Sequence, residues 1–130
     1  MPHFTIEYTS NIKNEANIAG LLKSINHVLI SRNDIFPIGG IRSRAIELYD
    51  YRVADGSGDD AFVHATLKIG AGRSEADKRM VCDELFKVIK EHFKELFEKR
   101  YLALSMELIE FSEAGTYKHN NIHARFKHQS

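Results

Sequence analysis

Two stretches of alternating apolar and polar residues, each followed by an amphipathic helix pattern, recur in the two halves of this chain. The first unit covers residues 4–30, and the second covers residues 62–89. Alternation with a period of two is typical of a half-buried strand, whereas apolar residues at three- and four-residue steps are typical of a helix with one buried face. This repeat restricts the chain to folds that contain two related β-α-β units.

In the first half, the pattern predicts a strand over residues 2–8 and a helix over residues 14–31 that is capped by Asn14. Residues 45–53 read as a second strand, and Asp-Gly-Ser-Gly at residues 55–58 reads as a hairpin turn. The segment before that strand contains a proline and a Gly-Gly pair, so it is expected to be irregular.

In the second half, residues 60–69 are predicted to form a strand, and Ser74 is a good N-cap for a helix that runs to about Arg100. A last strand is expected over residues 102–111. The apolar stripe of the helix consists of Val81, Leu85, Val88, Ile89, Phe93, Leu96 and Phe97.

The resulting β-α-β-β-α-β order predicts an α+β fold, with a four-stranded sheet and two helices on one of its faces. We expect a single domain over residues 1–130, with pseudo-repeat halves at about 2–58 and 59–112 and a tail at 113–130. The opposite face of the sheet has no cover within the chain and is not fully polar, so we expect self-association through it.

Composition excludes several classes of function. The chain has 130 residues, 43% of them hydrophobic, and 18 Lys+Arg balance 18 Asp+Glu. This zero net charge gives no support for binding to nucleic acid or to a membrane surface. The lone Cys82 cannot form an internal disulfide. No apolar run approaches a bilayer-spanning length and no secretory signal opens the chain, so a cytoplasmic protein is expected.

The seven histidines raise the question of a metal site. His119, His123 and His128 lie in one tail, but neither cysteines nor an HExxH pattern accompanies them. We therefore expect no metal site.

Pro2 can supply an unusual base if Met1 is removed. A proline nitrogen inside a chain belongs to an amide, whereas at the chain end it is a basic secondary amine on a rigid ring. An ordinary α-amino group titrates near ~8. Apolar surroundings and nearby arginines both lower such a pKa toward neutrality, where general acid–base catalysis works best.

Two arginines stand in glycine-flanked loops, where a guanidinium group can face a carboxylate. Arg42 follows a Gly-Gly pair, and Arg73 follows Gly-Ala-Gly immediately before the Ser74 cap, where free backbone N–H groups also favour an anion. We expect Arg44 to point away from Arg42 if the segment is extended, so it is the weaker candidate.

The order and spacing of several segments resemble the tautomerase superfamily, and most of all its 5-carboxymethyl-2-hydroxymuconate isomerase family. The resemblance covers nearly the whole chain. Its segments are Pro-His-Phe at 2–4, Ile-Phe-Pro at 35–37, Gly-Gly-Ile-Arg-Ser-Arg at 39–44, Ala-Phe-Val-His at 61–64, Leu-Lys-Ile-Gly-Ala-Gly-Arg-Ser at 67–74 and Asn-Asn-Ile-His-Ala at 120–124.

The resemblance implies a cofactor-free isomerase that forms homotrimers with the sheets facing inward. Pro2 maps to the catalytic base of the family, and Arg42 and Arg73 map to its substrate-binding arginines. The implied substrate is 5-carboxymethyl-2-hydroxymuconate, a dienol acid of homoprotocatechuate (4-hydroxyphenylacetate) degradation, which is converted to its conjugated 2-oxo isomer.

Two alternatives remain open at this point. Relatives with the same fold and the same proline act as other enol-acid tautomerases, dehalogenases or hydratases, and the sequence does not give the pocket shape that selects the substrate. The other alternative is a non-enzymatic trimeric binding protein in which Pro2 has no catalytic role.

Overall fold

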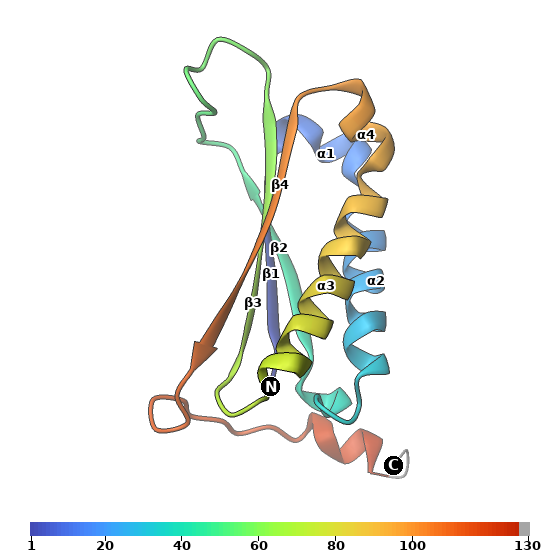
Figure 1. The fold of residues 1–130 in the computed structure, drawn as a ribbon, viewed down its shortest axis with the longest axis vertical. Coiled ribbons are helices and arrows are strands. Elements are labelled where there is room, and N and C mark those ends of the chain that lie inside the picture. Colours follow the sequence, from blue (N-terminus) through green and yellow to red (C-terminus); the bar gives the residue numbers. More distant parts are fainter. Residues whose placement is uncertain (128–130) are drawn as a thin grey trace.

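A computed structural model describes residues 1–127 as one mixed sheet with helices on one of its faces (Figure 1). The strands are β1 (His3–Thr9), β2 (Arg42–Leu48), β3 (Ala61–Gly70) and β4 (Leu102–Phe111). The helices are α1 (Lys13–Ala16), α2 (Ile18–Ser31), α3 (Glu75–His92) and α4 (Lys94–Lys99), and the 3-10 turns are η1 (Ser10–Ile12), η2 (Ile38–Gly40) and η3 (Ile122–Phe126). The predicted α+β class and the order of the main elements are confirmed. His128 lies outside the described residues.

The sheet has the strand order β2-β1-β3-β4. β1 pairs in parallel with β2, and β3 pairs in parallel with β4, whereas the central pair β1 and β3 is antiparallel. The start of β1 therefore lies beside the start of β2 and near the end of β3, because His3 pairs with both Arg42 and Lys68. This register brings the chain start and the segments that carry both candidate arginines to one end of the sheet.

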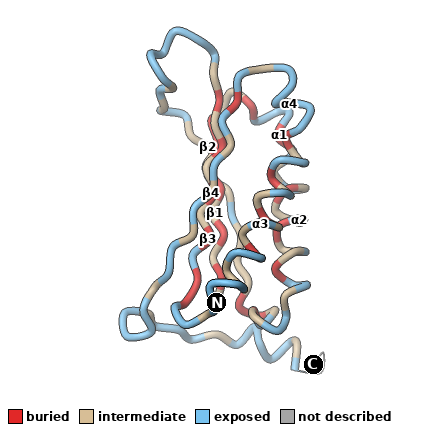
Figure 2. Tube along the Cα trace, in the orientation of Figure 1, coloured by how far each residue is buried: buried red, intermediate tan, exposed pale blue. Residues whose placement is uncertain are grey.

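The hydrophobic core lies between the sheet and the two long helices, and Figure 2 shows the buried segments facing each other across this layer. The predicted alternation in β3 is confirmed, since Val63, Ala65, Leu67 and Ile69 are all buried. The helices contribute one buried face each, made of Leu21, Ile25 and Leu29 in α2 and of Val81, Leu85 and Ile89 in α3. In the part of the chain that the structure describes, no element packs over the other face of the sheet (Figure 1).

The first long helix begins later than predicted. Asn17, not Asn14, is the N-cap of α2, and its side-chain oxygen accepts a hydrogen bond from the Gly20 N–H at 3.3 Å. Asn17 has a left-handed backbone conformation (φ 44°), which Asn tolerates better than most residues. A Cβ at position 20 would lie 2.4 Å from the Asn17 side-chain amide, so this cap requires glycine there.

The predictions for the second strand and its hairpin were wrong. β2 begins at Arg42 rather than residue 45 and ends at Leu48 rather than residue 53, because it pairs with β1, which ends at Thr9. β2 and β3 are not neighbours, since β1 lies between them. Residues 55–58 do turn, but the turn belongs to a loop between non-adjacent strands.

The second long helix does not run unbroken to Arg100. α3 ends at His92, and Phe93 separates it from α4 with a non-helical backbone (φ −98°, ψ 11°) while its side chain stays buried in the core. The break also changes the predicted apolar stripe, because Phe97 in α4 is 57% exposed.

Candidate active site

The chain start is held at one end of the sheet by backbone pairing. The carbonyl of Pro2 accepts a hydrogen bond from the Arg42 backbone N–H at 3.0 Å, and Pro2 is buried. The preceding residue, Met1, lies against the η2 turn, because a Cβ on Gly40 would lie 3.5 Å from the Met1 Cα. The sheet register thus places the terminal residues beside the turn that leads into Arg42.

The Arg42 guanidinium folds back on the η2 turn. Its Nη1 donates to the carbonyl of Gly39 at 3.2 Å. The same carbonyl accepts a hydrogen bond from the Asn120 side chain at 3.1 Å, so the C-terminal segment and Arg42 share one acceptor. This anchor therefore depends on residues 39–42 and on the tail.

Arg73 is fixed from two sides at the entry to α3. Its Nη1 donates to the Gly70 carbonyl at 2.9 Å, and its Nη2 donates to the Ile35 carbonyl at 3.2 Å. The guanidinium also lies 5.1 Å from the centroid of the buried Phe36 ring, in a cation–π contact. These contacts join the loop after α2 to the loop after β3.

The helix start beside Arg73 behaves as the sequence predicts. Ser74 caps α3, and its hydroxyl accepts a hydrogen bond from the Asp77 N–H at 3.1 Å. Glu75 and Asp77 already lie in the first turn, where their charges favour the positive end of the helix dipole. The arginine side chain is therefore a better partner for an incoming carboxylate than the helix end.

Both arginines keep donors for a ligand. A guanidinium carries five N–H donors, and the carbonyl contacts above use one of them in Arg42 and two in Arg73 at normal hydrogen-bond distance. Among residues 1–127, neither side chain forms a salt bridge with a carboxylate. Two oriented, unneutralised guanidinium groups suit an anionic ligand.

The electrostatic field at the chain start disfavours a positive charge. Burial lowers the pKa of the Met1 amine below its ordinary value, and the positive charges of Arg73, Lys118 and Arg42 lower it further. Glu113 acts in the opposite direction and raises it. An amine in this place is therefore neutral at a lower pH than an ordinary chain end, which is the condition for a base that works near pH 7.

Arg44 differs from the other two arginines in its hydrogen-bond partner. Its Nη1 donates to Nδ1 of His3 at 3.2 Å on the uncovered face of the sheet. Burial and the charge of Arg44 lower the pKa of His3, so the imidazole stays neutral and accepts this bond. The prediction that Arg44 points away from Arg42 was wrong, because the two residues pair with His3 and Thr5 of β1 and therefore lie on the same face of the sheet.

The remaining candidate groups show no catalytic arrangement. In residues 1–127, no three His, Cys, Asp or Glu side chains are placed to hold a metal ion. Burial raises the pKa of the Cys82 thiol, which keeps it protonated and unreactive. None of the described helices is both long and apolar enough to cross a membrane.

Sequence reasoning missed the contribution of the tail to this site. The segment that contains Asn120 and His123 packs on η2, and a Cβ on Gly39 would lie 2.8 Å from the His123 Cα. Gly39 is thus required for the close approach of two backbones. The signal in the sequence was the Gly-Gly pair, which predicts a tight contact but does not name the partner.

The fold has clear relatives among solved structures. A member of the cis-3-chloroacrylic acid dehalogenase family superposes with a TM-score of 0.66 over 92% of this chain and 81% of the other, at 9% identity, which shows a shared fold alone. The fold therefore defines the class of this chain as an α+β protein with a four-stranded mixed sheet, and it brings the chain start to the same end of the sheet as the segments of Arg42 and Arg73.

The family follows from closer matches. The sequence profile described as "5-carboxymethyl-2-hydroxymuconate isomerase" matches residues 2–126. The chain is 46% identical to the 5-carboxymethyl-2-hydroxymuconate Delta-isomerase of Escherichia coli over 98% of this chain and all of the relative. A crystal structure of a 5-carboxymethyl-2-hydroxymuconate isomerase from Deinococcus radiodurans R1 superposes with a TM-score of 0.94 at 55% identity, covering 97% of this chain and 94% of that one. The chain belongs to the 5-carboxymethyl-2-hydroxymuconate isomerase family, and it is an isomerase.

Proposed function

We propose that this chain isomerises 5-carboxymethyl-2-hydroxymuconate in homoprotocatechuate degradation, with the terminal amine of Pro2 as the base after removal of Met1. The single observation that carries the site assignment is the meeting of the chain start with Arg42 and Arg73 at one end of the sheet. The family supports the reaction, and the geometry supports the choice of these residues as its site. The family match favours this isomerisation over the dehalogenase, hydratase and binding-protein alternatives.

The reaction needs one group that both accepts and returns a proton. The neutral Pro2 nitrogen takes the proton of the 2-hydroxyl, and the C2–O bond becomes a carbonyl as the double bonds shift along the chain. The protonated amine then delivers the proton to C5, which leaves a double bond between C3 and C4 conjugated with the new carbonyl. No electrons are gained or lost, so the step requires no redox cofactor.

The arginines act on the charges of the substrate. Arg42 and Arg73 bind carboxylates through their free donors and hold the dienol over the amine. Negative charge builds on the C2 oxygen as its proton leaves, and a guanidinium already fixed by two carbonyls stabilises that charge without reorganising.

The direct test of this function is the ultraviolet change of 5-carboxymethyl-2-hydroxymuconate on addition of the purified protein. We expect rapid conversion to the conjugated 2-oxo isomer, and much slower reactions with other enol acids and halogenated acrylates. Faster turnover of a halogenated acrylate than of the dienol acid would replace the isomerase with a dehalogenase.

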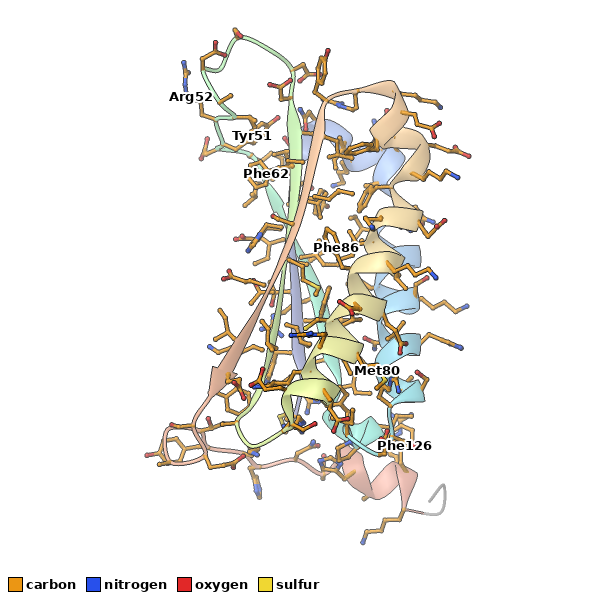
Figure 3. All side chains as sticks on the ribbon, viewed as in Figure 1. Tyr51, Arg52, Phe62, Met80, Phe86 and Phe126 are labelled. Carbon is orange, nitrogen blue, oxygen red and sulfur yellow. The ribbon has the colours of Figure 1, made fainter. Side chains whose placement is uncertain are left out.

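We further propose that the chain forms homotrimers in which the uncovered sheet faces turn inward. This face presents apolar side chains among polar ones: Ile46 is 47% exposed, Ile109 is 39% exposed, and Tyr51 meets Phe62 edge-on with ring centroids 6.5 Å apart (Figure 3). A sheet face of this kind is suited to burial against identical copies.

Replacing Ile109 with arginine is expected to weaken the assembly, because the new charge would have to be buried between subunits. Sedimentation should show the wild type at three times the 14.9 kDa subunit mass and the variant shifted toward smaller species. Met80→Arg, at an exposed α3 position, is the matched control and should leave the assembly intact. A monomeric wild type at micromolar concentration would contradict the trimer.

A further inference from the structure

The C-terminal segment after β4 connects the supports of both candidate arginines. At one end, the Glu113 carboxylate lies 3.2 Å from where a Cβ on Gly70 would stand, and the Gly70 carbonyl holds Arg73. At the other end, the Asn120 side chain binds the Gly39 carbonyl, which also holds Arg42. The residues between these two anchors therefore span the space from one arginine support to the other.

Lys118 lies on this span and carries a positive charge. Its ammonium group lies 3.5 Å from the Glu113 carboxylate, and its side chain is only 36% exposed. Glu113 is 69% exposed, so the pair is loose and open to water, where such ion pairs contribute little. A substrate carboxylate can displace Glu113 from Lys118 at small cost.

The positive charge of Lys118 also affects the amine at the chain start. Lys118 lowers the pKa of the terminal amine, and it ranks between Arg73 and Arg42 in this effect. Since Coulomb effects fall with distance, this effect indicates that the charge of Lys118 lies on the same side of the molecule as the chain start. The charges of Arg73, Lys118 and Arg42 thus all act on the amine in the same direction.

We propose that Lys118 binds the carboxymethyl carboxylate of the substrate. The inference rests on the proposed function, because it takes 5-carboxymethyl-2-hydroxymuconate as the ligand. That compound carries three carboxylates, two at the ends of its linear skeleton and one on the branch. Arg42 and Arg73 match the two skeleton carboxylates, and Lys118 is the third cation for the branch. Lys118 is thus a specificity residue that selects for the branched substrate.

The test compares Lys118→Gln with wild type on two ligands. For 5-carboxymethyl-2-hydroxymuconate, we expect KM to rise about tenfold or more with a small change in kcat, because a charged contact to the ground state is lost. For 2-hydroxymuconate, which lacks the branch, we expect an unchanged affinity, measured from its inhibition of turnover of the branched substrate. Lys118→Arg should restore most of the lost affinity, and Lys87→Gln, at an exposed α3 position, should match wild type.

Each other outcome is decisive. An unchanged KM in Lys118→Gln, or an equal loss of affinity for both ligands, overturns the role of Lys118 while leaving the proposed function intact. If 2-hydroxymuconate does not inhibit the wild type, the two arginines do not bind the skeleton carboxylates. The assignment of the branch carboxylate to Lys118 is then overturned as well. A wild type that does not convert the branched substrate overturns the proposed function itself.

Discussion

Replacing Pro2 with alanine is expected to lower kcat/KM for 5-carboxymethyl-2-hydroxymuconate by about 10²- to 10⁴-fold, the range that correct positioning of an acid–base group contributes. The alanine variant keeps a terminal amine, but it loses the ring that fixes the nitrogen relative to β1. The Pro2 carbonyl bond to the Arg42 N–H uses only backbone atoms, so we expect the fold to survive. Initial rates from the ultraviolet change of the substrate measure the effect.

Pro37→Ala provides the matched control for this change. Pro37 is the only other proline of the chain, and its nitrogen is an amide that cannot act as a base. We expect this variant to keep most of the activity, with circular dichroism showing both variants folded. A folded Pro2→Ala protein with near-wild-type kcat/KM would contradict a role for the proline ring, because alanine still leaves a primary amine at the chain start.

Replacing Arg73 with alanine is expected to lower kcat/KM by about 10²- to 10³-fold, with a fall in kcat as well as a rise in KM. The guanidinium is fixed by the carbonyls of Gly70 and Ile35, so it meets developing charge in a set orientation. Arg73→Lys keeps the charge but loses the planar fork, and we expect it to recover only part of the activity.

The Arg73 change also has a predicted effect on pH dependence. Arg73 is the charge that most lowers the pKa of the Met1 amine, so we expect its removal to raise the pKa of the Pro2 amine that takes this place at the chain start. Because the neutral amine is the active form, the rising limb of kcat/KM should move to higher pH in Arg73→Ala. Arg79→Ala, at an exposed position of α3, should leave both the rate and the limb unchanged. If the rising part of the pH profile of kcat/KM does not move in Arg73→Ala, Arg73 does not lower the pKa of the catalytic base.

Local patterns predicted those parts of the fold that local interactions determine. The alternation in β3 and the Ser-x-x-Asp spacing at the start of α3 each depend on neighbours within a few residues, and both were predicted correctly. β2 was misplaced because Arg42 and Arg44 occupy its outward positions, so its first residues do not read as a half-buried apolar strand. Its bounds come from pairing with β1, which a local pattern does not contain.

The candidate site also has features that the sequence predicts and features that depend on long-range contacts. The chemistry of a terminal proline and of loop arginines can be recognised from residue type and from the resemblance to a family. The hydrogen bond from the Asn120 side chain to the Gly39 carbonyl joins positions 81 residues apart, and no sequence motif predicts it. Lys118 reaches the site only because this bond and the contact of Glu113 with Gly70 fix the tail at two points. Such long-range contacts follow from the tertiary fold.

The central claim is that a neutral proline amine at the chain start is the catalytic base. Its most direct test is an NMR titration of protein labelled with ¹⁵N-proline, beside the pH profile of kcat/KM. Only two prolines give signals, and Pro37, as an amide, does not titrate. We predict that the Pro2 signal titrates with a pKa below the ordinary value of about 8 for a chain end, and that the rising limb of kcat/KM follows the same pKa. A Pro2 signal that stays at an amide shift in active protein, or that titrates apart from the activity, would contradict the account.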